Sequence, residues 1–318
     1  MQALWIDNQQ LSLKSDLDMP SLPSGHALIK VDCAGICGTD LGLLQGYYPF
    51  TGIPGHEFVG TVERGPAHWS GQRVVGEVNI TCGFCDACKH ARSNHCENRQ
   101  VLGIKNHHGA FAQYLTLPID NLYRVPDSLS DEVAVFTEPV AAALQILQQI
   151  DINQQHKVVV IGAGRLGQLI AQALFLTGCQ LLVIGRNPEK LEHLQGLGIE
   201  TAGGGHQPDR VFDIAVECSG NPQGFALARA CIRPQGVLVL KSTYAGNVEI
   251  DMSSLVVDEI SLLGSRCGPF DKALAMLSSA QIKFDYLLSK VFALSAGIEA
   301  FDYASQAGVL KVLIKPGE

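Results

Sequence analysis

The sequence lacks several features that would assign it to a particular class of protein. No apolar run approaches the roughly 20 residues that a transmembrane helix requires. Its first residues show no basic segment followed by an apolar stretch, so no secretory signal peptide is expected. Charged residues make up only 17%, and no basic stripe suited to nucleic-acid phosphates is visible. We therefore expect a cytoplasmic protein that binds neither membranes nor nucleic acids.

What is present is an ordinary globular composition with clustered cysteine. The 318 residues are 47% hydrophobic and carry a net charge of -8, which we interpret as a contribution to solubility. One hydrophobic core stops growing at roughly 250–300 residues, so two domains are expected. Four of the ten cysteines crowd into one short segment. Because the cytoplasm is reducing, these four indicate a metal site rather than disulfides.

The pattern of apolar residues changes near residue 157. Residues 1 to about 125 combine short strand-like stretches with frequent glycine and proline, which is typical of a β-rich domain. Further on, apolar strands alternate with helical patterns, which predicts an α/β fold with a doubly wound parallel sheet. Strands are expected at 27–31, 72–75, 158–161, 181–184, 214–216 and 237–240, and helices at 166–176, from 188, at 223–232 and at 272–279. A closing strand, 311–315, is expected to return to the first domain.

A glycine-rich turn joins one of these strands to the following helix. The strand 158–161 runs into Gly162-Ala163-Gly164-Arg165-Leu166-Gly167, which is the pattern G-x-G-x-x-G. Gly162 permits a tight turn, Gly164 lets the backbone approach a pyrophosphate, and Gly167 lets helix and strand pack closely. The helix N-terminus adds unpaired N–H groups and a positive dipole. Strand, turn and helix together predict a dinucleotide site, whereas the glycines alone would indicate only a turn.

The residues after the second strand distinguish the two nicotinamide cofactors. An NAD site usually places Asp or Glu there, where the carboxylate binds the ribose 2′-hydroxyl. This chain has Gly185-Arg186-Asn187 instead. The glycine leaves space and Arg186 can pair with a 2′-phosphate, so we predict a preference for NADP(H) over NAD(H). The alternative is that Arg186 is a solvated surface charge.

Four cysteines follow one another at the spacing C-x2-C-x2-C-x7-C: Cys82, Cys85, Cys88 and Cys96. Four thiolates in a short loop can close a tetrahedral zinc site with no open position, which makes the metal structural. An iron–sulfur cluster also takes four thiolates and is the alternative. His90 and His95 lie nearby in the sequence, but four cysteines already satisfy the metal.

Several further motifs run through the chain in a fixed order. They are Gly35-Ile36-Cys37-Gly38-Thr39-Asp40, Gly55-His56-Glu57-Phe58-Val59-Gly60, Gly71-Gln72-Arg73-Val74, Gly109-Ala110-Phe111-Ala112-Gln113-Tyr114, Glu138-Pro139-Val140-Ala141 and Glu217-Cys218-Ser219-Gly220. Together with the glycine turn and the four cysteines, they resemble the zinc-containing medium-chain dehydrogenase/reductase family over nearly the whole chain.

The resemblance implies a division into two domains and an assembly. A β-rich, GroES-like catalytic domain would comprise residues 1–125 and 271–318 and would carry the structural zinc lobe at 82–96. A Rossmann dinucleotide-binding domain would comprise residues 126–270. The same resemblance implies two zinc ions per chain and a homodimer or homotetramer.

By this resemblance, Cys37 and His56 are ligands of a catalytic zinc ion. The third ligand is a cysteine in some branches of the family and a glutamate in others. The segment 136–139 resembles the glutamate branch, so Glu138 is the candidate for this ligand. Glu57 is expected as an exchanging ligand or as a carboxylate behind the ligands.

Two residues beside Cys37 match supporting groups of the family. Thr39 matches the hydroxyl of its proton relay, and Asp40 matches the carboxylate that orients the zinc-binding histidine. Many relatives place a histidine at the outer end of the relay, where this chain has Gly42. Water, or another group such as the nearby His107 or His108, would then take its place.

These residues predict an enzyme that transfers a hydride between an alcohol, polyol or sugar and NADP(H). Zinc makes a bound alcohol more acidic and stabilises negative charge on oxygen, which assists hydride transfer in both directions. One alternative is an NAD-dependent polyol dehydrogenase. Another is a non-catalytic NADPH-binding sensor, which would keep the glycine turn but lose its zinc ligands.

Overall fold

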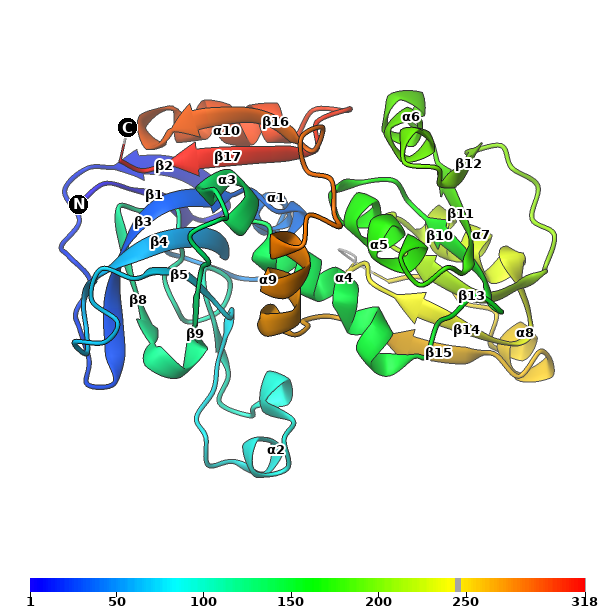
Figure 1. The fold of residues 1–318 in the computed structure, drawn as a ribbon, viewed down its shortest axis with the longest axis horizontal. Coiled ribbons are helices and arrows are strands. Elements are labelled where there is room, and N and C mark those ends of the chain that lie inside the picture. Colours follow the sequence, from blue (N-terminus) through cyan, green and yellow to red (C-terminus); the bar gives the residue numbers. More distant parts are fainter. Residues whose placement is uncertain (244–246, 318) are drawn as a thin grey trace. The chain divides into compact units, whose positions relative to one another are not determined.

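The computed structural model describes residues 1–243 and 247–317, and the chain divides into two compact units (Figure 1). The first unit comprises Met1–Glu138 and the C-terminal segment from Phe270, and the second comprises Pro139–Pro269. The first unit thus continues past residue 125 and ends inside helix α4 (Thr137–Gln149). Across the two described ranges, no helix combines the length and the apolar character that crossing a membrane requires.

The first unit is built on a seven-stranded sheet. Six of its strands lie in the order β16 (Leu288–Ala293), β17 (Lys311–Lys315), β3 (His26–Gly35), β4 (Glu57–Arg64), β5 (Arg73–Gly76) and β9 (Leu122–Arg124). The seventh, β8 (Tyr114–Pro118), pairs with β3 outside this path. β17 pairs antiparallel with β3, so the C-terminal strand returns to the first domain as predicted. Because β3 has neighbours on both sides and is mostly buried, it forms the centre of the unit.

Shorter elements complete the first unit. The strands β1 (Ala3–Asp7) and β2 (Gln10–Lys14) form a hairpin, and β6 (Asn79–Ile80) pairs with β7 (Gln100–Val101) at the base of the cysteine-rich lobe. The helices are α1 (Gly38–Leu44), α2 (Asp86–Lys89), α3 (Asp131–Ala134), α9 (Phe270–Ser278) and α10 (Gly297–Ala304).

The second unit contains a six-stranded sheet in which every pairing is parallel. Its strands lie in the order β12 (Glu200–Gly203), β11 (Gln180–Gly185), β10 (Lys157–Ile161), β13 (Phe212–Glu217), β14 (Ile232–Leu240) and β15 (Ser261–Gly264). The chain runs outward from β10 to β12 and then crosses to β13 on the other side. This reversal between β10 and β13 confirms the predicted doubly wound Rossmann fold, and ligands bind such sheets at the reversal.

Helices cover the parallel sheet and begin at well-defined caps. α5 (Arg165–Phe175) and α6 (Pro188–Gly196) pack against β10, β11 and β12, and α7 (Pro222–Cys231) packs against β10, β13 and β14. Because such crossovers are right-handed, α5 and α6 are expected on one face of the sheet and α7 on the other. The side chains of Asn187 and Asn221 accept hydrogen bonds from the first turns of α6 and α7, and a proline follows each of them. These caps fix where each helix starts relative to the preceding strand.

Candidate metal centres and cofactor site

Three of the predicted catalytic-zinc residues come together in the first unit. The donor atoms of Cys37, His56 and Glu57 lie within 4.8 Å of one another. His56 and Glu57 are only 4% and 1% exposed, and Cys37 is half-buried. A thiolate, an imidazole and a carboxylate form a donor set that suits zinc. Within the described ranges Glu138 does not belong to this group; it is the half-buried second residue of α4.

Neighbouring strands bring these donors together. β3 ends at Gly35, and Gly35 pairs with Glu57, the first residue of β4. Cys37 follows the end of β3 and is the N-cap of α1. His56 directly precedes β4. The end of β3 and the start of β4 are adjacent in the sheet, so the Cys37 thiol and the His56 imidazole lie side by side.

The fully buried carboxylate of Asp40 contacts both predicted ligands. Its Oδ2 accepts a hydrogen bond of 2.8 Å from the backbone N–H of Cys37, and its Oδ1 lies 3.2 Å from Nδ1 of His56. The second contact is electrostatic, because neither atom has a well-aligned hydrogen-bond partner. With Nδ1 directed toward Asp40, Nε2 is the nitrogen that would hold a metal.

The same pocket favours a positive charge. Burial opposes a charge on His56, but the Asp40 carboxylate and the Cys37 thiolate outweigh burial and raise the pKa of His56 well above its ordinary value. A divalent cation would satisfy the same negative groups, so the pocket fits the predicted metal.

The Glu57 carboxylate also forms an ion pair with Lys311, the first residue of β17. Both side chains are buried, and Nζ of Lys311 lies 3.4 Å from the carbonyl oxygen of Ile36. The sequence alone does not single out this partner, because β17 has a lysine at each end around three apolar residues.

The predicted relay residues have different surroundings. The hydroxyl of Thr39 lies 3.8 Å from the Cys37 sulfur. His107 and His108 instead line a pocket of about 240 Å³ together with residues 49–51. Nδ1 of His108 accepts a hydrogen bond from the backbone N–H of Ile53, and burial lowers the pKa of both histidines. Residues 49–51, which line this pocket, precede His56 by a few positions in the chain.

The four clustered cysteines form a second group whose donor atoms lie within 4.8 Å of one another. Their sulfurs are separated by 3.5 Å for Cys85–Cys88, 3.8 Å for Cys85–Cys96 and 3.6 Å for Cys82–Cys96. A zinc–sulfur distance of about 2.3 Å in a tetrahedron gives sulfur–sulfur edges of about 3.8 Å. The spacing therefore fits a closed tetrahedral zinc site.

The lobe around these sulfurs has little other core. Its buried cluster consists of cysteines and Ala87, and Phe84 is 66% exposed. Although burial acts in the opposite direction, backbone N–H groups of Phe84 and Cys85 lower the pKa of Cys82 to about 6. A thiolate is the form that binds metal, so the backbone of the loop favours the form of Cys82 that a metal ion would require.

The glycine turn at 162–167 in the second unit combines tight backbone packing with one open position. Gly162 has φ +116°, and a Cβ there would lie 2.9 Å from the backbone of Cys218. A Cβ on Gly167 would lie 2.0 Å from the carbonyl oxygen of Gly162, so only glycine permits this packing. Gly164, the N-cap of α5, has no atom near its would-be Cβ. Its bare backbone therefore stays open to an incoming ligand.

Basic side chains lie near the end of β11. Arg186 is exposed, and its Cγ lies 3.0 Å from the position that a Cβ on Gly204 would take. The pKa of Lys190 in α6 is lowered, first by burial and then by the positive charge of Arg165 in α5. Arg165 and Arg186 are recognisable from the sequence, whereas Lys190 is not. The close packing of α5 and α6 adds this third cation.

Two families match the chain in succession. Residues 23–127 match the alcohol dehydrogenase GroES-like domain, and residues 166–279 match the family described as zinc-binding dehydrogenase. The first segment contains strands β3 to β9 with the cysteine lobe, and the second contains the parallel strands β11 to β15.

Named relatives cover most of the chain. It is 30% identical to L-threonine 3-dehydrogenase of Anaeromyxobacter sp. (strain K), with 79% of each chain covered. It is 28% identical to D-arabitol-phosphate dehydrogenase of Enterococcus avium, with 94% of this chain and 92% of that one covered.

Solved structures with the same fold hold different cofactors. A zinc-binding dehydrogenase of Sinorhizobium meliloti 1021 bound to NADP is 26% identical, with a TM-score of 0.90 and 99% of each chain covered. An alcohol dehydrogenase of E. coli CFT073 complexed with NADH is 25% identical, with the same TM-score and coverage. The chain belongs to the zinc-containing medium-chain dehydrogenase/reductase family and is an oxidoreductase of the zinc-dependent alcohol dehydrogenase type.

Proposed function

We propose that the protein transfers a hydride between an alcohol or polyol and NADP(H), with a zinc ion held by Cys37 and His56. The observation that carries this proposal is the convergence of three zinc-type donors with a buried carboxylate behind the histidine. Zinc bound there supplies Lewis acidity, which makes an alcohol easier to deprotonate and a carbonyl easier to reduce.

The residues around this centre have distinct roles in the proposal. Cys37 and His56 hold the metal, and Asp40 fixes the imidazole ring and the backbone of Cys37. Thr39, whose hydroxyl lies beside the Cys37 sulfur, accepts the alcohol proton and passes it to water.

Two glutamates are candidates for the third protein ligand of the catalytic zinc ion. Glu57 belongs to the clustered donors but is paired with Lys311, whereas Glu138 lies at the end of the first unit. We retain Glu138 as the permanent ligand and assign Glu57 the exchanging position. Zinc content of the Glu138→Gln and Glu57→Gln variants separates these roles, because only loss of a permanent ligand removes the metal.

We also propose a structural zinc ion in the four-cysteine lobe, which brings the total to two per chain. The sulfur separations near 3.5–3.8 Å support it. Metal analysis of the purified protein gives two zinc ions per chain if both sites are filled. Iron with acid-labile sulfide would instead favour the cluster.

The cofactor proposal rests on charge. Gly185 is followed by Arg186 rather than an acid, and Lys190 and Arg165 add positive charge near this strand end. A 2′-phosphate carries negative charge that these groups attract, whereas a 2′-hydroxyl does not. The NADP-bound relative favours this assignment, and the NADH-bound relative keeps an NAD-dependent polyol dehydrogenase as the second candidate.

A coupled assay tests the reaction and the cofactor together. Zinc-loaded protein is incubated with NADP⁺ or NAD⁺ against simple alcohols, polyols, polyol phosphates, aldoses and L-threonine, and nicotinamide reduction is followed by absorbance. The polyol phosphates and threonine are included because the named relatives act on such compounds. We expect turnover with NADP⁺ that is lost in Cys37→Ala. No turnover with any compound, despite NADPH binding, would favour the non-catalytic sensor.

We propose that the protein is a cytoplasmic homodimer or homotetramer, with a contact at the edge of the parallel sheet. β15 is one of the two edge strands of this sheet, and α8 (Met252–Val257) precedes it. Three apolar side chains of α8 are strongly exposed, Met252 at 62%, Val256 at 72% and Val257 at 80%. An edge strand with unpaired backbone groups can pair antiparallel with its own copy across a two-fold axis.

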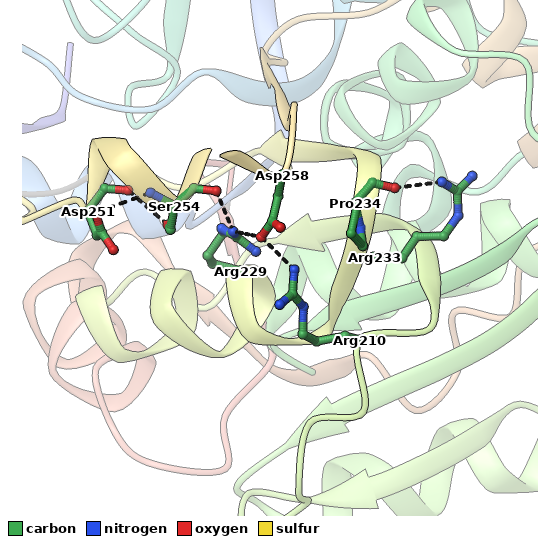
Figure 2. A network of polar contacts seen from close by, with 7 residues as sticks. All are labelled: Arg210, Arg229, Arg233, Pro234, Asp251, Ser254 and Asp258. Carbon is green, nitrogen blue, oxygen red and sulfur yellow. Dashed lines mark hydrogen bonds and ion pairs between the residues drawn. The ribbon is translucent and has the colours of Figure 1, made fainter. Parts of the chain in front are cut away.

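A polar network holds α8 in place. Figure 2 shows Arg229 of α7 and Arg210 both directed toward Asp258, the C-cap of α8. Arg229 also donates to the carbonyl oxygen of Ser254 inside α8, and Asp251 caps its first turn. The exposed apolar side chains are thus presented on an anchored helix. Sedimentation of wild type and of Val257→Asp tests the contact, since a buried charge would dissociate the copies.

A further inference from the structure

The buried ion pair between Glu57 and Lys311 joins a predicted metal-site residue to a residue 254 positions away. Glu57 is 1% exposed and Lys311 3% exposed. The donor atoms of Glu57 also lie within 4.8 Å of those of Cys37 and His56. The carboxylate therefore has two cationic partners available, the ammonium group of Lys311 and a metal ion held by Cys37 and His56.

The three central strands fix this arrangement. β17 pairs with β3, and β3 pairs with β4, so Lys311, Gly35 and Glu57 come from adjacent strands. A Cβ at Gly35 would lie 2.5 Å from Oε2 of Glu57 and 3.4 Å from Cδ of Lys311. Only glycine at position 35 leaves room for the carboxylate and the lysine to meet across β3. The pair is therefore held by the sheet rather than by flexible loops.

We infer that Lys311 is a positioning residue that holds Glu57 off the catalytic metal and so keeps a coordination position open for substrate. This inference rests on the proposed function, because it presupposes zinc at Cys37 and His56. The carboxylate cannot give its full charge to both cations, so the ammonium group weakens its attraction to the metal. Without Lys311, the nearest cation for Glu57 is the metal, and the open position closes.

The first test measures how fast zinc leaves the protein. Lys311→Met removes the charge but keeps an unbranched side chain, and Lys311→Arg keeps the charge. We expect zinc release from the catalytic site to a chelator to slow by roughly 10- to 100-fold in Lys311→Met, a range typical of changes around metal ligands. Lys311→Arg is expected to release zinc at nearly the wild-type rate.

A second measurement reports the coordination directly. Cobalt(II) replaces zinc, and its visible absorption weakens when coordination rises from four to five. The difference spectrum between Lys311→Met and wild type cancels the contribution of the four-cysteine site, which both proteins share. We expect this difference to show weaker visible bands, and we expect no such difference for Lys311→Arg.

Removing Glu57 provides the decisive control. If Lys311 acts through Glu57, then Lys311→Met has no effect on zinc release or on the cobalt spectrum in a Glu57→Gln background. This double variant also avoids a buried carboxylate without a partner, which protects the test against misfolding. Equal zinc release in wild type and Lys311→Met, or an effect that persists in the Glu57→Gln background, would overturn the inference.

Failure of the proposed function gives a different result. In that case the wild-type protein binds only one zinc ion per chain, and Cys37→Ala does not change its zinc content. The inference about Lys311 would then be wrong together with the proposed function. If wild type binds two zinc ions and Cys37→Ala loses one, the variants at Lys311 test the positioning role alone.

Discussion

The carboxylate of Asp40 lies 3.2 Å from Nδ1 of His56 while its other oxygen accepts a hydrogen bond from the backbone of Cys37. One side chain thus sets the position of both proposed zinc ligands. Asp40 belongs to the first turn of α1 and is fully buried. The start of α1, the Cys37 thiol and the His56 imidazole therefore form one unit, so a change at Asp40 would affect a bound metal ion without contacting it.

Asp40→Asn is expected to weaken the catalytic zinc site by roughly 10- to 100-fold in affinity, since an amide holds the imidazole less firmly than a carboxylate does. Zinc per chain is measured after dialysis against increasing chelator. Asp32→Asn is a matched control, because the Asp32 carboxylate accepts a hydrogen bond from Thr61 and does not belong to the metal group. If Asp40→Asn retains zinc as well as wild type does, then Asp40 does not support the catalytic zinc site as proposed.

Cys85→Ser is expected to lower zinc content by one ion per chain and to reduce the temperature of thermal unfolding. The lobe has few apolar contacts apart from its sulfurs, so a metal ion bound there would supply much of its folding energy. Cys179→Ser is the control, since Cys179 is a buried cysteine outside both metal groups. A full zinc content in Cys85→Ser would contradict the structural site.

The parts of the site that the sequence predicts are those whose chemistry lies within a short segment. The glycine turn at 162–167 and the four cysteines at 82–96 are recognisable from local spacing; the structure gathers the four sulfurs and gives Gly162 a positive φ. The alternation of apolar strands and helices likewise predicts the parallel sheet, because buried parallel strands are apolar along their whole length. The resemblance to a family, rather than spacing, identifies Cys37 and His56.

The residues that sequence analysis missed depend on long-range packing. Lys311 reaches Glu57 only because β17 returns to pair with β3, and the sequence predicts this return but not which side chains meet. Lys190 joins Arg165 only because α5 and α6 pack together. A lysine on a strand or helix is usually a solvated charge, so its type and spacing gave no reason to single it out.

Arg186→Ala and Lys190→Ala are expected to weaken NADPH binding by roughly 10- to 100-fold, since a hydrogen bond to a charged group is worth about 1.5–3 kcal/mol. NADH binding should change little, because NADH lacks the 2′-phosphate. Fluorescence titration of both cofactors gives the ratio of affinities. Arg233→Ala is the control, as this arginine pairs with Asp213 and lies on a different strand. An equal loss of affinity for NADH and NADPH would show that these residues do not recognise the 2′-phosphate.

Asp258→Asn is expected to lower the unfolding temperature at neutral pH by removing the partner of Arg210 and Arg229. Hydrogen bonds from Arg210 and Arg229 lower the pKa of Asp258 in the folded protein. A lowered folded pKa stabilises the protein above the ordinary aspartate pKa, and this contribution is lost as pH falls through the folded value. The difference in unfolding temperature between wild type and Asp258→Asn should therefore become smaller in acid. Thermal unfolding at several pH values measures it. A difference that stays constant with pH would exclude the charge of Asp258 as its cause.

Thr39→Val is expected to lower kcat by roughly 10²–10⁴-fold, the usual range for losing a group that transfers a proton. Valine has nearly the shape of threonine but no hydroxyl, so zinc content should stay at two ions per chain. Thr39→Ser keeps the hydroxyl and should retain most of the activity. Steady-state kinetics with the best substrate of the coupled assay provide the comparison. If Thr39→Val turns over as fast as wild type, the alcohol proton leaves by another route, and the histidines beside the pocket at residues 49–51 become the next groups to replace.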